Sequence, residues 1–217
     1  MPGMIYPIDA VLAVTYRCQS RCRMCSIWQM SEHDDVPPQI YEKLPVTLMD
    51  VNLSGGEPFL RKDLTEIVRI VHGRVPKARI IVSTNGLMGK AMVPRALELQ
   101  RIDPGIGFGI SVDGIGEMQD FIRGVKGAFD NAVEVAKGLR AEGVDNIRFA
   151  FTLTRENASH MTRVYELAGE LGVQFTMAMA HDSDFFFGSH DSAIVRELSL
   201  IHISEPTRLD ARSRMPS

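Results

Sequence analysis

Residues 10–25 read AVLAVTYRCQSRCRMC, and this stretch says most about the fold. Its first seven residues are mainly apolar and β-forming, which is typical of a buried strand. The strand runs directly into a loop that holds Cys18, Cys22 and Cys25, and the sequence has no other cysteine. Three cysteines in one short loop make a poor disulfide framework, so the pattern favours metal ligation.

Five further strand-like runs follow along the chain. The six strands are expected at residues 10–16, 49–53, 79–83, 107–112, 147–153 and 175–180. Stretches with helical character lie between them, at residues 40–44, 64–71, 91–99, 128–142 and 159–171. Strands that alternate with helices are typical of parallel βαβ units. We therefore predict an α/β fold: a partial (β/α)6 barrel with parallel strands, incomplete at its C-terminus.

Each expected strand ends in a polar or glycine-bearing loop. After the cysteine loop come GGEP (55–58), STNG (83–86), SVDG (111–114), TLTRENAS (152–159) and AHDSD (180–184). In barrel-like α/β folds the active site lies at the carboxyl ends of the strands, so we expect these loops to meet at one rim. Thr154 and Asn157 could face a substrate there or cap the helix that follows. His181 and Asp182 are further candidates for substrate contact.

The spacing C-x3-C-x2-C supplies three thiolates, the ligands that iron–sulfur clusters require. A 4Fe–4S cube has four irons, so three cysteines leave one iron open, as in catalytic metal sites. The cysteines alone are also compatible with a zinc knuckle that lacks its fourth ligand, or with a ferredoxin-like electron carrier. His33 is the only histidine near the loop.

CQSRCRMC resembles the cluster motif of the radical S-adenosylmethionine (SAM) superfamily, and GGEP, STNG and SVDG resemble that family's further motifs in order. The resemblance implies a 4Fe–4S cluster on Cys18, Cys22 and Cys25, with the open iron chelated by SAM. It implies reductive cleavage of SAM to methionine and a 5′-deoxyadenosyl radical, which abstracts hydrogen from a peptide or small metabolite. It also implies a reducing partner of the flavodoxin or ferredoxin type.

Individual residues match SAM-binding positions of the family. Gly55, Gly56, Glu57 and Pro58 match the motif for the SAM amino group; glycines admit close approach and a carboxylate suits an ammonium. Met24 stands where the family has a bulky apolar residue near the adenine. Ser83, Asn85, Ser111 and Asp113 look like contacts to the SAM sugar and amino-acid portion. Arg123 resembles an arginine that contacts the SAM carboxylate.

Composition narrows the class of protein. The 217 residues are 45% hydrophobic and 24% charged, as in an ordinary single globular domain. The net charge of -3 offers no basic stripe for nucleic acid. No apolar run approaches the roughly 20 residues that span a bilayer, and the first residues do not resemble a signal peptide. We expect a cytoplasmic protein that binds neither membrane nor nucleic acid.

The C-terminal stretch stands apart from this pattern. Residues 198–208, LSLIHISEPTR, resemble the translation of a transposase adapter used in sequencing libraries, and residues 213–217 match its flanking sequence in the same frame. We therefore predict a truncated radical SAM core at residues 1–197 and a non-native tail at residues 198–217. A cysteine-rich domain with auxiliary clusters, which many members of the family carry, would lie beyond residue 197.

Overall fold

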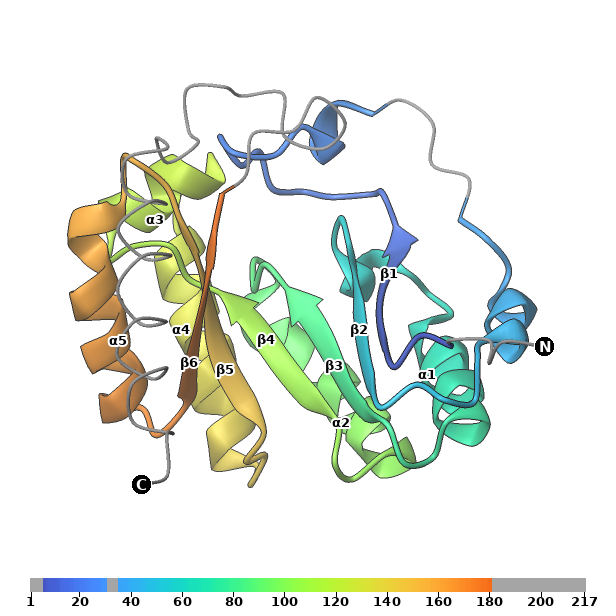
Figure 1. Ribbon diagram of the computed structural model, residues 1–217. Coiled ribbons are helices and arrows are strands. Elements are labelled where there is room, and N and C mark those ends of the chain that lie inside the picture. The colour runs from blue at the N-terminus through green and yellow to red at the C-terminus, as the bar shows by residue number, and fades with distance from the viewer. Residues whose placement is uncertain (1–5, 31–34, 181–217) are drawn as a thin grey trace, which may run out of the picture.

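In the computed structural model of the protein, the residues described are 6–30 and 35–180. Six strands form one sheet in the order β1-β2-β3-β4-β5-β6, and every neighbouring pair is parallel. They are Asp9–Thr15 (β1), Asp50–Gly55 (β2), Arg79–Thr84 (β3), Gly107–Ser111 (β4), Ile147–Leu153 (β5) and Gln174–Met179 (β6). The sheet curves into an open arch from β1 to β6 (Figure 1). The predicted partial barrel of six parallel strands is confirmed.

Of the five α-helices in the described residues, four cover the outer face of this arch and one lies at its rim (Figure 1). The outer helices are α1 (Leu64–Arg74), α2 (Met92–Ile102), α4 (Ala128–Ala141) and α5 (Met161–Glu170). The expected helix at residues 40–44 is a 3-10 helix, η2 (Pro38–Lys43), and η5 (Ala158–His160) precedes α5. Three more 3-10 turns are η1 (Ile27–Gln29), η3 (Pro58–Leu60) and η4 (Gly89–Ala91). The predicted loop at residues 180–184 with His181 and Asp182, and the predicted tail at residues 198–217, concern residues from 181 onward, which lie outside the described ranges.

Helix α3 (Glu117–Arg123), at the rim, is absent from the sequence-based prediction. Its seven residues are too few to show a repeating apolar stripe, which is the main signal for a helix. Glycines mark both of its ends: Gly116 is the N-cap, and Gly124 is the C-cap in the left-handed region with φ 65°. Its position makes α3 important for the site, because its last residues contact the cysteine loop.

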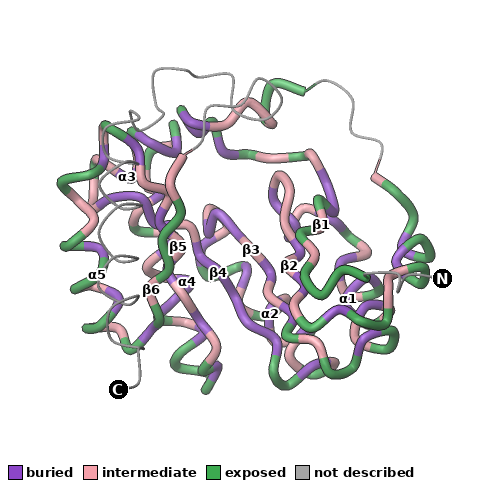
Figure 2. The backbone as a smooth tube through the Cα atoms, viewed as in Figure 1, coloured by how far each residue is buried: buried purple, intermediate pink, exposed green. Residues whose placement is uncertain are grey.

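The core follows from the apolar spacing in the sequence. In α1, Leu64, Ile67, Val68 and Val71 recur at helical spacing, and all four are buried. The first four residues of β4 are buried as well, as expected for a central strand of a parallel sheet. Buried residues gather along the central strands, whereas β1 and β6 at the ends of the arch carry more exposed ones (Figure 2).

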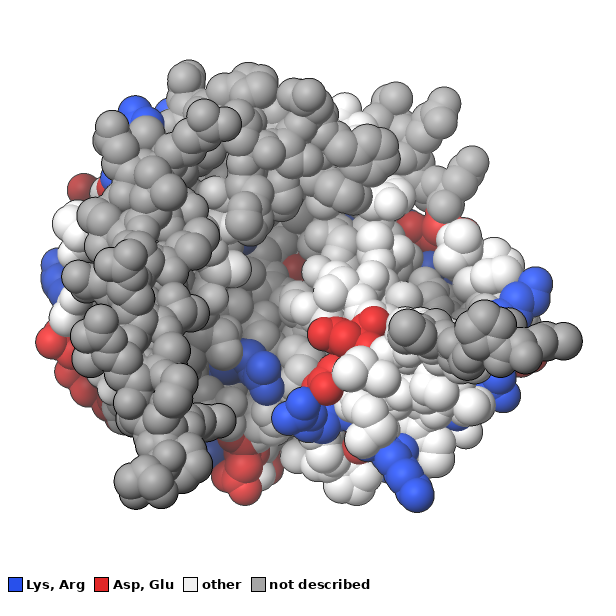
Figure 3. Space-filling view, in the orientation of Figure 1, with Lys and Arg blue, Asp and Glu red and all other residues white. Residues whose placement is uncertain are grey.

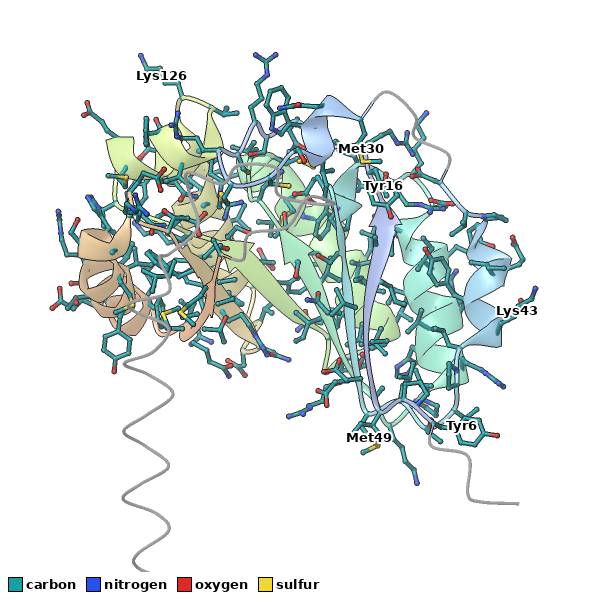
Figure 4. All side chains as sticks on the ribbon, turned by 45° about the horizontal axis from the view of Figure 1, so that its top comes forward. Tyr6, Tyr16, Met30, Lys43, Met49 and Lys126 are labelled. Carbon is teal, nitrogen blue, oxygen red and sulfur yellow. The ribbon has the colours of Figure 1, made fainter. Side chains whose placement is uncertain are left out.

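The segment after β1 crosses the rim of the arch towards α3 (Figure 1). Tyr16 and Met30, near the two ends of this segment, lie at the same end of the sheet, and Tyr6 and Met49 lie at the opposite end (Figure 4). The loop with the three cysteines therefore lies at the carboxyl ends of the strands. Backbone hydrogen bonds hold it at two places.

We call the first of these places the β2 anchor. The Gly56 amide donates to the Thr15 carbonyl at 2.7 Å, and the Glu57 amide donates to the Arg17 carbonyl at 2.8 Å. A Cβ on Gly56 would lie 2.2 Å from the Arg17 carbonyl oxygen, closer than any side chain tolerates. Only glycine therefore allows this approach of the chain after β2 to the start of the cysteine loop.

The second place is the α3 anchor. The amides of Arg21 and Arg23 donate to the carbonyls of Arg123 and Ile122, each at 2.9 Å, so the loop uses free acceptors at the end of α3. Cys22, Met24 and Ile122 form a small buried apolar cluster there, with Cys25 and Met118 packed against it. This cluster is separate from the main core, so α3 and the cysteine loop stabilise each other.

Candidate active site

A cavity of about 340 Å³ opens at the carboxyl ends of the strands, and all three cysteines line it. This volume is at the low end of the range for small-molecule sites, roughly 300–1,000 Å³. The space-filling view shows a hollow near the centre of the molecule, on the concave side of the sheet (Figure 3). Residues from the cysteine loop, from strands β2 to β6 or the loops after them, and from α3 contribute to its lining. Side chains far apart in the sequence thus meet at one rim, as the loop pattern predicts.

Seven of the ten residues expected to contact SAM line this cavity, and three do not. Those that line it are Met24, Gly55, Gly56, Ser83, Asn85, Ser111 and Arg123. Glu57, Pro58 and Asp113 are buried behind its wall. The Ser83 hydroxyl donates to Asn52 Oδ1 at 2.8 Å. Among the described residues, Arg123 is the only charged side chain in the lining.

The carboxylate of Glu57 is directed at the STNG loop. It accepts hydrogen bonds from the Asn85 amide at 2.7 Å, the Phe59 amide at 3.1 Å and the Thr84 hydroxyl at 3.0 Å. Burial raises the pKa of Glu57 from 4.5 to about 7, although these hydrogen bonds oppose the shift. Gly55 and Gly56 line the cavity, and the Glu57 carboxylate, expected to contact an ammonium, lies behind its wall.

The carboxylate of Asp113 is also turned away from the cavity. It forms an ion pair with Arg123 and accepts a hydrogen bond from the Thr152 amide at 2.7 Å. Burial raises the pKa of Asp113, and the charge of Arg123 opposes that shift. Burial alone would lower the pKa of Arg123, but the charges of Asp113 and Cys22 raise it, so the guanidinium stays protonated.

The loop after β5 holds Asp113 from the other side. The Asn157 side-chain amide donates to the backbone carbonyls of Asp113 and Thr152, both at 2.9 Å, and Asn157 Oδ1 accepts from the Thr154 amide at 2.7 Å. Thr154 and Asn157 are fully buried and do not line the cavity, and the Asn157 side chain does not cap η5. Asn157 does stand at the N-cap position of η5, where its backbone carbonyl accepts from the His160 amide at 2.8 Å, and its side chain shapes the SVDG loop.

Each of two cysteines receives a donor from one side of the cavity. Asn85 Nδ2 lies 3.7 Å from Cys18 Sγ, and Arg123 Nη1 lies 3.5 Å from Cys22 Sγ. Burial raises the pKa of Cys18 to about 11, and burial also raises the pKa of Cys25. These thiols therefore stay protonated without metal, and ligation has to release their protons.

The donor set fits an iron–sulfur cluster. Three cysteines, free of disulfides, face one cavity, and thiolates are the ligands that such clusters use. Among the described residues, no three His, Cys, Asp or Glu side chains converge on one point as the ligands of a single ion would. A cluster does not require that convergence, because each thiolate binds a different iron.

Sequence reasoning missed several residues of the cavity lining. They are Ser20, Ile27, Trp28, Ser54, Thr84, Thr152, Ala178, Met179 and Ala180. Trp28 has a signal in the sequence, since it is the only tryptophan and follows the third cysteine by three residues. Its indole nitrogen donates to the Cys22 carbonyl at 3.4 Å. Thr152 and Met179 have no such signal, because their orientation depends on where β5 and β6 end.

The radical SAM superfamily model matches residues 12–168, which is most of the chain. The chain therefore belongs to the radical SAM superfamily. The matched span includes the cysteine loop and the GGEP, STNG and SVDG loops.

Individual relatives act on different kinds of molecule, judging by their names. The chain is 32% identical over 174 residues to pre-heme d1 synthase of Dinoroseobacter shibae, covering 74% of this chain and 40% of that protein. It is 28% identical over 167 residues to Fe-coproporphyrin III synthase of Methanosarcina barkeri, covering 72% and 40%. It is 29% identical over 176 residues to PqqA peptide cyclase of Ruegeria pomeroyi, covering 77% and 46%. The chain thus spans less than half the length of these relatives.

Solved structures show the same fold. The structure of Streptococcus suis SuiB bound to S-adenosylmethionine superposes with a TM-score of 0.72 at 16% identity, covering 95% of this chain and 48% of SuiB. Methylornithine synthase (PylB) superposes with a TM-score of 0.66, covering 90% of this chain and 60% of PylB.

None of the helices in the described ranges has the length and apolar character of a membrane span.

Proposed function

We propose that this chain is the catalytic core of a radical SAM enzyme that abstracts hydrogen from its substrate. The observation that carries the proposal is one cavity lined by Cys18, Cys22 and Cys25 together with the backbone of Gly55 and Gly56. The three cysteines hold a 4Fe–4S cluster, and SAM occupies the rest of the cavity. An electron supplied through the bound cluster cleaves SAM to methionine and a 5′-deoxyadenosyl radical, which takes a hydrogen atom from the substrate.

The residues of the lining have distinct tasks in this proposal. Gly55 and Gly56 let the backbone approach the SAM amino group, and Met24 packs near the adenine. Asn85, Ser83 and Ser111 offer polar contacts to the sugar and amino-acid portion. Glu57 and Asp113 support the site from behind by fixing the loops that carry these contacts. Arg123 meets the SAM carboxylate; its Nε is buried and has no hydrogen-bond partner among the described residues.

The substrate is a peptide or a small metabolite. The names of the relatives include both kinds, since a peptide cyclase and two tetrapyrrole-related synthases align with the same stretch. SuiB has also been solved with its precursor peptide SuiA, with a TM-score of 0.69 to this chain. The electron comes from a flavodoxin- or ferredoxin-type partner in the cytoplasm.

Anaerobic reconstitution tests the proposal. The chain should hold about four irons and four sulfides, bind SAM in equilibrium dialysis, and release 5′-deoxyadenosine when dithionite is added. Cys22→Ala should lose the cluster and the product, whereas Ser26→Ala, next to a ligand, is the matched control and should keep the cluster. A cluster without SAM affinity would favour the alternative, an electron-transfer or structural iron–sulfur module. Stoichiometric zinc without iron would contradict the cluster assignment.

A further inference from the structure

A buried charge pair connects the end of β4 to one of the cysteines. Asp113 follows β4, Arg123 ends α3, and Cys22 lies in the middle of the cysteine loop. Their exposed fractions are 0%, 7% and 8%. Arg123 uses one nitrogen, Nη2, for Asp113 and another, Nη1, for Cys22 Sγ at 3.5 Å. The guanidinium is therefore held between a carboxylate and a sulfur atom.

The surrounding hydrogen bonds fix this pair in place. The Asp113 amide donates to Gln119 Oε1 at 2.6 Å, and Gln119 Nε2 donates to the Ser111 carbonyl at 2.8 Å. The Thr152 amide donates to the Asp113 carboxylate at 2.7 Å, and the Asn157 side-chain amide donates to the Asp113 carbonyl. Backbone carbonyls at the end of α3 also accept hydrogen bonds from the Arg21 and Arg23 amides of the cysteine loop. The same short helix thus orients Arg123 and the sulfur atom that Arg123 contacts.

We propose that Arg123, held by Asp113, is a positioning residue for Cys22 that raises the reduction potential of the cluster bound by the three cysteines. The inference rests on the proposed function, because it requires the cluster. It gives Arg123 a second role, in addition to its contact with the SAM carboxylate. It also gives Asp113 a part in setting the charge around the cluster.

The physical reason is the sign of the charge. Reduction adds an electron to the cluster, and a cation beside a ligand sulfur stabilises the more negative state. Arg123 is the only charged side chain that lines the cavity among the described residues, so no nearby charge in the lining offsets it. Asp113 lies behind Arg123 and reduces this effect. The Asn85 amide at Cys18 is uncharged and 3.7 Å away, so its influence should be weaker.

Redox titration of the reconstituted full chain without SAM, followed by electron paramagnetic resonance, measures this effect. In Arg123→Gln the reduced-to-oxidised ratio at a fixed potential should fall at least tenfold, which equals a midpoint about 59 mV more negative. Arg123→Lys keeps the charge and should restore part of the shift. Asp113→Asn removes the counter-charge and should move the midpoint in the positive direction. Asn85→Ala should lower the midpoint less than Arg123→Gln does.

Controls separate the charge effect from general damage to the fold. Arg23→Gln removes an exposed charge next to Cys22 and should leave the midpoint near that of the wild type. Circular dichroism of the metal-free protein checks that each variant folds. If a single variant does not fold, Asp113→Asn/Arg123→Gln leaves no unpaired buried charge, and its midpoint should still lie below that of the wild type.

The outcomes decide between the roles of Arg123. An unchanged midpoint in folded Arg123→Gln with full iron content overturns the proposal, even if its SAM affinity falls, since Arg123 would then serve SAM alone. A folded Arg123→Gln that loses iron while Arg123→Lys keeps it supports the positioning of Cys22. Equal loss of iron in both variants overturns the role of the charge. Wild-type protein that holds the cluster but does not bind SAM refutes the proposed function and leaves the midpoint test intact.

Discussion

A fully buried carboxylate lies beside each anchor of the cysteine loop, Glu57 beside the β2 anchor and Asp113 beside the α3 anchor, but the two have different partners. Beside the β2 anchor, Glu57 accepts hydrogen bonds from uncharged groups, the Phe59 and Asn85 amides and the Thr84 hydroxyl, and the Asn85 side chain reaches Cys18. Beside the α3 anchor, Asp113 faces the guanidinium of Arg123, which reaches Cys22. Both sides therefore connect a carboxylate to a cysteine through one donor residue.

The difference decides what each side responds to. A buried carboxylate with neutral donors reduces its desolvation penalty by taking up a proton, so the stability contribution of Glu57 should depend on pH. A buried carboxylate with a cation is costly when either partner is removed, so the Asp113 side should respond to changes of charge. Three experiments sharpen this comparison, taken from the largest expected effect to the smallest.

The largest effect is expected on the charged side. Asp113→Asn should lower the free energy of unfolding by about 3–5 kcal/mol, because it leaves Arg123 buried without its counter-charge. Asp113→Asn/Arg123→Gln should lose clearly less than the sum of the two single variants. Urea denaturation followed by circular dichroism measures all three. The exposed ion pair of Asp50 and Arg79 is the matched control, and Asp50→Asn should have little effect. Strictly additive losses would show that Asp113 and Arg123 do not act as a pair.

On the neutral side, the effect should depend on pH. The pKa of Glu57 is raised from 4.5 to about 7 in the folded state, so between these values the folded protein binds the extra proton. Stability from Glu57 is then full below about pH 4.5 and is lost as the pH rises through about 7. The loss should be up to about 3 kcal/mol.

Urea denaturation of the wild type and Glu57→Gln at several pH values between 4.5 and 8 checks this. The wild type should lose stability relative to Glu57→Gln as the pH rises, because glutamine does not titrate. Glu98→Gln, at an exposed position on α2, should follow the wild type. A wild type that gains stability over this range relative to Glu57→Gln would mean that the carboxylate is held ionised.

The smallest of the three effects concerns the glycines of the two anchors. Gly56→Ala places a Cβ 2.2 Å from the Arg17 carbonyl oxygen, and Gly124→Ala places one 2.4 Å from the Arg21 carbonyl oxygen. Each substitution should lower the free energy of unfolding, measured by urea denaturation, by about 1–3 kcal/mol. Each should also lower the iron content after reconstitution. Gly73→Ala, in α1 with open space around it, should be neutral or stabilising. Full iron content in both anchor variants would show that the loop does not depend on its anchors.

Sequence patterns predict the fold better than they predict the orientation of side chains at the rim. The alternation of apolar runs gives all six strands, because burial of a parallel sheet requires it. The motifs place Glu57 and Asp113 at the correct strand ends, but both carboxylates turn into the wall. The regular alternation of side chains stops where a strand ends, so the pattern cannot say which way a loop residue points. Trp28, in η1, and Thr152, within β5, also line the cavity, although none of the SAM-binding motifs includes them.

The position of Trp28 gives the protein an optical reporter of its own. The sequence has a single tryptophan, so all tryptophan emission comes from one place at the cavity, beside the Cys22 carbonyl. A cluster that absorbs near-ultraviolet and visible light would quench this emission by energy transfer. Filling of the site could therefore be followed continuously in an anaerobic cuvette, without a label and without any substrate.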